Sequence, residues 1–142
     1  MLSASVTYGA DNEIYVDQSG TGANIDLEQL GISNIIGGLN STAGNLTAFD
    51  LDGTSMTLDI NMIGATNKFL GDINANSFTG LYNFTGGSNT FTIQVDPTNT
   101  YSSNSSDQNI AVTGSSNTFT LNQGTTAIAA SLNLDWIIQG SN

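Results

Sequence analysis

The stretch Gly86-Gly87-Ser88-Asn89-Thr90-Phe91 (GGSNTF) is one copy of a sequence phrase that recurs along the whole chain. The phrase reads Gly, two residues, Asn, any residue, then a large apolar residue. Its copies contain Gly9, Asn12 and Ile14; Gly31, Asn34 and Ile36; Gly64, Asn67 and Phe69; Gly86, Asn89 and Phe91; and Gly114, Asn117 and Phe119. A shortened copy, Gly140-Ser141-Asn142, stands at the end.

The spacing of this phrase predicts a repeat architecture. The first three steps, from Asn12 through Asn34 and Asn67 to Asn89, are two, three and two times eleven positions, and the later steps are less regular. Self-similarity at a period of this size is typical of stacked repeats. Between the phrases, apolar and polar residues alternate, which indicates strands with one buried face. The sequence therefore predicts an all-β fold, a β-solenoid of about six stacked coils with a period near 22 residues.

Stacking of such units places equivalent residues directly over one another. Gly suits the positions where the chain reverses, and Asn tolerates a left-handed backbone and bonds to its own turn. The apolar residue of each phrase then forms an inward column, in which Phe91 and Phe119 are neighbours. Gln18 and Gln29, eleven residues apart, face inward as a second, polar ladder. The best internal match superposes residues 26–34 (DLEQLGISN) on residues 59–67 (DINMIGATN).

The chain is expected to form one domain over residues 1–142. Residues 1–11 are predicted to be an N-terminal cap, and residues 97–108, which contain the only proline, a loop inserted in the stack. The longest unit, which begins at Asn34, carries an additional arm that includes residues 46–51. The C-terminal end is expected to be open, so that either the chain continues there or the open edge meets another copy.

Two resemblances follow from these residues. Gln29, Gly31 and Asn34 match the Gln-x-Gly-x-x-Asn repeat of curlin-type proteins, which implies a two-strand β-solenoid that forms extracellular fibres. Gln18 and Gly20 match it too, but Asn24 is one residue late, and Met62 and Ile138 replace the glutamine later. The phrases GLYNFTGGSNTFTIQVD and GSSNTFTLNQ are similar in style to virion structural proteins of tailed phages that infect marine bacteria.

The composition excludes several functions. The net charge is −11 and Lys68 is the only base, which opposes binding to nucleic acid and to anionic membrane surfaces. The chain has no His and no Cys, so it has no Ser-His-Asp or Cys-His nucleophile, no disulfide and none of the usual zinc ligands. No segment is apolar for long enough to span a bilayer or resembles a signal peptide. We expect no cofactor, no metal and no catalytic residue.

The carboxylates are expected to be a solvated acidic surface. Asp50 and Asp52 share the outward face of one strand, and Asp26 lies one unit from Asp59. Asp50-x-Asp52-Gly53 is similar to the start of a calcium loop, but the twelfth position holds Asn61 instead of the required Glu. Tyr15 and Tyr101 are the aromatic residues expected to face a partner.

Three functions are consistent with these features. The first is a non-enzymatic structural protein of a phage virion surface, which decorates the particle or forms a fibre by stacking on itself and on other virion proteins. The second is an extracellular, curlin-like amyloid fibre subunit of a bacterium. The third is a glycan-binding module that uses the loop at residues 97–108.

Overall fold

A computed structural model describes residues 2–3, 12–38, 49–95, 104–123 and 130–140. These residues form strands and no helix, so the expected all-β class is confirmed. The strands are β1 (Leu2–Ser3), β2 (Asn12–Ile14), β3 (Val16–Thr21), β4 (Asn24–Ile36), β5 (Phe49–Gly86), β6 (Ser88–Val95), β7 (Asp107–Gly114), β8 (Asn117–Gln123) and β9 (Asn133–Gln139).

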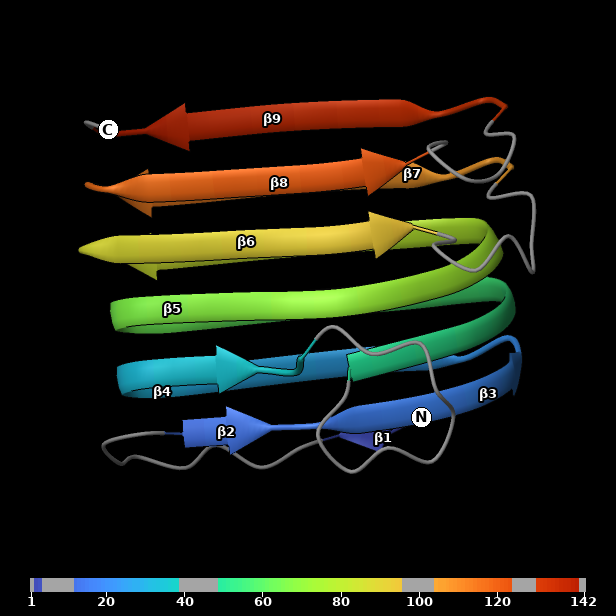
Figure 1. Cartoon of the computed structure of the whole chain (residues 1–142), viewed down its shortest axis with the longest axis horizontal. Helices are drawn as coiled ribbons and strands as arrows, with labels where there is room; N and C mark the ends of the chain where they lie inside the picture. Colours follow the sequence, from blue (N-terminus) through green and yellow to red (C-terminus); the bar gives the residue numbers. More distant parts are fainter. Residues whose placement is uncertain (1, 4–11, 39–48, 96–103, 124–129, 141–142) are drawn as a thin grey trace.

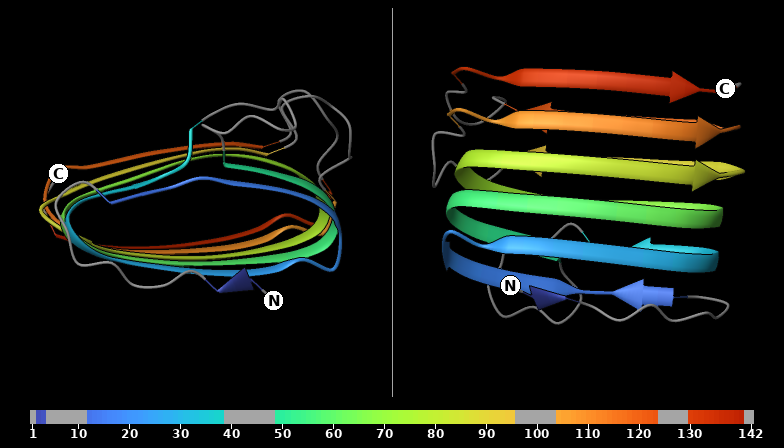
Figure 2. Two further views of the ribbon diagram at one scale, coloured as in Figure 1. Left: turned by 90° about the horizontal axis from the view of Figure 1, so that it is seen from below. Right: turned by 180° about the vertical axis from the view of Figure 1, so that it is seen from behind.

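All of the pairings between these strands are parallel, and the strands lie one above another from β1 and β2 at one end to β8 and β9 at the other (Figure 1). Seen along the stack, the chain follows a flattened loop with two long sides (Figure 2). We call them the asparagine side, which contains β2, β3, β6 and β8, and the return side, which contains β7 and β9. The long strands β4 and β5 turn corners and contribute to both sides.

The register places the repeated residues opposite one another. Asn12 pairs with Asn34, Asn34 with Asn67, Asn67 with Asn89, and Asn89 with Asn117. The apolar residue two positions later forms a second column of Ile14, Ile36, Phe69, Phe91 and Phe119. Of the predicted repeat residues, Gly9 and the last two residues of the shortened copy, Ser141 and Asn142, lie outside the described part of the chain.

The unequal steps of the repeat are absorbed between strands. Ile14 pairs with Ile36, whereas Val16, only two positions later, pairs with Phe49, thirteen positions later. Eleven extra residues therefore lie between Ile36 and Phe49, where the Phe49 N–H donates to the Gly38 carbonyl at 3.1 Å. The predicted additional arm, residues 46–51, lies partly here. Residues 46–48 lie outside the described residues. Phe49 to Leu51 begin β5, and Phe49 pairs with Val16 of the layer below.

The predicted loop at residues 97–108 is also placed in part. Residues 97–103 lie outside the described residues, whereas Asp107 and Gln108 open β7 and pair with Thr79 and Gly80. Ile73 pairs with Val95, and Thr79, six positions after Ile73, pairs with Asp107, twelve positions after Val95. The connection from Val95 to Asp107 is therefore six residues longer than the equivalent connection from Ile73 to Thr79 in the layer before it.

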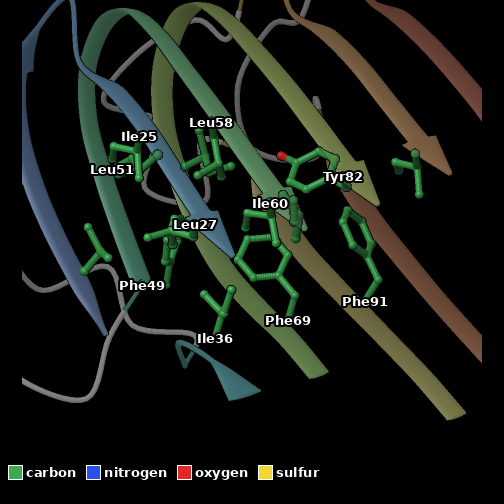
Figure 3. Close-up of a cluster of buried hydrophobic side chains, with 14 of the residues drawn as sticks. Ile25, Leu27, Ile36, Phe49, Leu51, Leu58, Ile60, Phe69, Tyr82 and Phe91 are labelled. Atoms are coloured by element: carbon green, nitrogen blue, oxygen red, sulfur yellow. The ribbon is translucent and has the colours of Figure 1, made fainter. Parts of the chain in front are cut away.

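The core lies between the two sides and is built from inward-facing residues of β3 to β7 (Figure 3). Aromatic rings continue through it: Phe69 lies 5.1 Å from Phe49 and 5.7 Å from Phe91, measured between ring centroids. Phe91 has no solvent exposure and lies 6.2 Å from Phe119. Burying each such side chain contributes about 1.5 to 3 kcal/mol, so the columns account for much of the stability of the fold.

Candidate functional site

The asparagine column is a continuous chain of side-chain hydrogen bonds. In each step the Nδ2 of one asparagine donates to the Oδ1 of the next, at 3.1 Å from Asn12 to Asn34 and 2.9 Å from Asn34 to Asn67. The chain continues at 2.8 Å from Asn67 to Asn89 and at 2.9 Å from Asn89 to Asn117. All donors point the same way along the stack, so the amide dipoles align and strengthen one another.

Each asparagine amide also ties its column to a turn of the backbone. Asn34 Nδ2 donates to the Ile63 carbonyl at 3.1 Å, and Asn67 Nδ2 donates to the Thr85 carbonyl at 3.0 Å. At the last layer Asn117 Nδ2 donates to the Gly114 carbonyl at 3.1 Å. The side chains of Asn34, Asn67 and Asn89 are fully buried. Because buried amides need such partners, only Asn fits these positions without loss.

The two glutamines expected to form a ladder lie in different columns. Gln29 is buried and its Nε2 donates to the carbonyls of Asn12 and Ile35, at 3.0 and 3.2 Å. Gln18 is half-buried and donates to the Ser19 carbonyl. In the next layer, Gln29 pairs with Met62 and Gln18 pairs with Leu51. Gln29 therefore closes the turn that leads into the asparagine column, and no glutamine ladder runs through the described layers.

A column of left-handed residues at the opposite corner was missed by the sequence analysis. Gly22, Ser55, Ser77, Ser105 and Ser131 all have positive φ, between 54° and 76°. They occupy one corner of successive layers, where the Ser77 N–H donates to the Asn104 carbonyl and the Ser105 N–H to the Ala130 carbonyl, both at 2.8 Å.

The sequence does contain a signal for this corner. Ser55, Ser77 and Ser105 follow one another at the same unequal steps as the asparagines of the repeated phrase, each serine standing twelve positions before its asparagine. The spacing between copies of the phrase changes, but the serine stays twelve positions before the asparagine in each copy. The serine is therefore part of the repeat. The serine corner could therefore have been identified from its position relative to Asn67, Asn89 and Asn117.

The acidic residues of the asparagine side are not all solvated, which corrects the expectation for Asp50. Asp17 pairs with Asp50 in the register, and Asn74 Nδ2 donates to Asp50 Oδ1 at 3.4 Å and to Asp52 Oδ1 at 2.9 Å. Asp50 is fully buried and Asp72 is 3% exposed. One oxygen of each, Asp50 Oδ2 and Asp72 Oδ1, has no hydrogen-bond partner among the described residues.

This burial shifts the titration of both groups. Desolvation, followed by the charges of Asp52, Asp72 and Asp17, raises the pKa of Asp50 to about 7. Desolvation alone raises the pKa of Asp72 to about 6. Both shifts favour a protonated carboxyl, because a buried carboxylate without a basic partner is costly. Asp26 and Asp59 are paired in the register as expected, and burial, then the charge of Asp26, raises the pKa of Asp59.

In the described part of the chain, no three His, Cys, Asp or Glu side chains are placed to hold a metal ion. A hollow of about 390 Å³ at the corner between β3 and β4 is lined by Gln18 to Ile25, a segment without an ionisable side chain. Tyr15 is exposed, as expected, and Tyr101 lies outside the described residues. The described residues contain no helix with the length and apolarity to cross a bilayer.

The last layer of the stack is the most apolar exposed surface among the described residues. We call β8 and β9 together the end layer. Leu134, Trp136 and Ile138 of β9 occupy inward positions but are 40%, 37% and 40% exposed. Trp136 packs edge-on against Phe119 across the core, with ring centroids 5.5 Å apart. The end layer is therefore a cross-section of the core that meets solvent.

Comparisons with models of known protein families, with characterised proteins and with solved structures find no match to this chain. The class that the fold defines is an all-β, parallel-stranded repeat protein.

Proposed function

We propose that this chain is a non-enzymatic structural protein. Its body is a β-solenoid of about six coils with a period near 22 residues, and it decorates a phage virion or forms a fibre on it. The observation that carries the proposal is the register of the asparagine column. From Asn12 to Asn117, the asparagine of each layer pairs with the asparagine of the next. Such a body repeats one set of contacts and needs no assembled active site.

The geometry favours mechanical stability over chemistry. Each layer is bonded to the next by a parallel backbone ladder, by an asparagine amide and by inward apolar side chains. Opening one layer breaks all three kinds of contact together. The buried carboxyls Asp50 and Asp72 are neutralised most simply by protons, and the only base, Lys68, is exposed on another column. We therefore propose neither an enzymatic role nor a cofactor.

The proposed partners are further copies of the chain and other virion or fibre proteins, at the virion surface. The acidic composition, with a net charge of −11, keeps such particles dispersed and argues against nucleic acid and membrane insertion. A second candidate is an extracellular, curlin-like fibre subunit. Gln29 favours it, because this glutamine of the Gln-x-Gly-x-x-Asn stretch bonds to the backbone of the asparagine turns.

Two measurements test the structural role. Digestion with a broad-specificity protease is expected to leave a resistant fragment that contains residues 49–95, and digestion as fast as that of heat-unfolded protein would overturn the proposal. Quantitative mass spectrometry of purified virions is expected to recover the chain in a fixed ratio to the major capsid protein. Recovery instead in thioflavin-positive fibres outside cells would assign it to the second candidate.

A further inference from the structure

Asp50 and Asp72 occupy one column in adjacent layers of the asparagine side. β5 passes along this side twice, first beside β3 and again beside β6 (Figure 1). The two passes are neighbours, because Asn74 Nδ2 on the second donates to Asp52 Oδ1 on the first, at 2.9 Å. Each of the two aspartates stands two positions before one member of this bond, and residues two apart share a face of a strand. Asp50 and Asp72 therefore face each other across about 4.8 Å between the strands.

Each of these two aspartates has one buried oxygen without a hydrogen-bond partner. Asn74 Nδ2 also donates to Asp50 Oδ1, at 3.4 Å, whereas Asp50 Oδ2 and Asp72 Oδ1 have no partner among the described residues. The two side chains are 0% and 3% exposed, so surface water does not take the place of a partner. Two ionised carboxylates cannot bond to each other, because all their oxygens are acceptors. One proton placed between the two oxygens satisfies both.

The charged surroundings of the pair are acidic. After desolvation, the causes that raise the pKa of Asp50 are the charges of three acidic neighbours: Asp52, Asp72 and Asp17. On the other side of the pair, β6 places Gln94 beside Asp72 and contains no ionisable side chain, while Asp96 lies outside the described residues. Lys68, the only basic side chain, is exposed and four positions before Asp72, about 13 Å along an extended strand. No described base is thus placed to neutralise the pair.

We propose that Asp50 Oδ2 and Asp72 Oδ1 share one proton, in a carboxyl–carboxylate hydrogen bond that joins two layers of the asparagine side. The pair then carries one negative charge instead of two, and both buried oxygens have a partner. The proton comes from water and returns to water as the pH rises. Two carboxylates then face each other where water does not reach, and they repel. The pair is thus a pH-sensitive contact between layers, a property that goes beyond the proposed structural role and does not depend on it.

Carbon-13 NMR of the side-chain carboxyls in the full, unchanged chain tests the shared proton directly. During a titration from about pH 3 to about pH 9, the resonances of Asp50 and Asp72 are each expected to move in two steps, at the same two pH values. The reason is that each proton lost from the pair changes the state of both carboxyls. A single step for each resonance, at a pH of its own, would mean two independent carboxyls and would overturn the proposal.

Two variants separate the shared proton from simple repulsion between charges. Asp72→Asn and Asp52→Asn each remove one acidic neighbour of Asp50, and the charge of Asp52 has the larger effect on the pKa of Asp50. In Asp72→Asn, Asp50 is expected to titrate in one step and to bind its proton about tenfold more weakly, because an amide N–H donates to the carboxylate directly. Asp52→Asn is the matched control and should keep both steps. Two steps at Asp50 in the Asp72→Asn variant would refute the shared proton.

Calcium tests the alternative occupant of the same oxygens, since carboxylates also suit a hard cation. At pH 8, the Tm of the full chain is measured in calcium chloride and in sodium chloride of equal ionic strength. The difference between the two salts is expected to be the same for the unchanged chain and for Asp72→Asn. A stabilisation by calcium that Asp72→Asn removes would assign the oxygens to a cation and overturn the proposal. Neither outcome bears on the proposed structural role, which protease resistance and recovery with virions judge separately.

Discussion

Asn67 connects three layers through one amide. It accepts a hydrogen bond from Asn34, donates to Asn89, and donates to the Thr85 carbonyl, all within 3.0 Å. Its side chain is fully buried, so water replaces none of these bonds when the amide is removed. A buried partner left unsatisfied costs more than the hydrogen bond itself contributes. The central members of the column should therefore be far less replaceable than the last one.

Asn67→Ala is expected to lower the free energy of unfolding by about 2 to 3 kcal/mol, because it removes the donor of the buried Asn89 Oδ1 and the bond to the Thr85 carbonyl. Asn117→Ala at the half-buried end of the column should cost less than about 1 kcal/mol. Urea unfolding of both variants measures the difference. Equal losses would contradict the idea that the column acts through buried, shared hydrogen bonds.

Ser77 represents the corner that the sequence analysis missed. Its φ of 54° lies in the left-handed region, which a β-branched side chain adopts only with strain. Ser77→Val is expected to destabilise the fold by about 1 to 3 kcal/mol, while Ser77→Asn is expected to be neutral or slightly stabilising. Ser77 is exposed, so a change in packing does not complicate the comparison. Thermal unfolding of the pair measures the effect, and a Val variant as stable as the Asn variant would refute it.

At the scale of the strands, the distance between layers is set by glycines as well as by hydrogen bonds. A Cβ added to Gly86 would overlap the Gly64 carbonyl oxygen of the layer below, and one added to Gly114 would overlap the Gly86 carbonyl oxygen. The glycine column thus lets parallel strands approach closely where each asparagine turn begins. The repeated Gly of the sequence phrase has this steric cause.

Gly86→Ala is expected to reduce the free energy of unfolding by about 3 kcal/mol, because β5 and the layers on either side must shift to admit the methyl group. Gly87→Ala is the matched control, since its added Cβ would lie 3.2 Å from the Ala65 carbonyl oxygen and needs only a small adjustment. Chemical denaturation monitored through Trp136 compares the two. If Gly87→Ala is the more harmful, close approach at Gly86 is not what limits the spacing.

At the scale of the whole molecule, the buried carboxyls make stability depend on pH. The pKa of Asp50 is raised from 3.8 to about 7 and that of Asp72 to about 6, both chiefly by desolvation. The folded state therefore holds protons that the unfolded state releases near pH 4. This contribution is fully present below about pH 4 and is lost as the pH rises toward 7. Mutual repulsion of the other carboxylates acts in the same direction.

The free energy of unfolding is accordingly expected to fall between pH 4 and pH 7, and Asp50→Asn should flatten this slope and make the protein more stable than the unchanged chain at pH 8. Denaturant titrations at each pH unit give the slope. Asp135→Asn removes the same formal charge from the exposed end layer and should leave the slope nearly unchanged. If the pH dependence of stability is unchanged in the Asp50→Asn variant, the burial of Asp50 is not its cause.

Alternation and repeat spacing in the sequence were enough to predict strands, inward residues and the pairing of Asn89 with Asn117. These features depend on local pattern and on likeness between units. The burial of Asp50 and the exposure of Trp136 depend instead on what lies beside or beyond a residue. Alternation gives Trp136 an inward position, but it does not say whether another layer follows. Asp50 faces outward as expected and is nevertheless enclosed.

The hydrogen bond from Phe49 to Gly38 has an implication for engineering. These two residues are eleven positions apart in the sequence, yet they meet at one point, while the layers on either side keep their alignment. Closing a loop costs only about 0.6 kcal/mol for each doubling of its length. A foreign peptide grafted between Gly38 and Phe49 is therefore carried by a scaffold that needs no redesign, and copies of the scaffold would display it as an array.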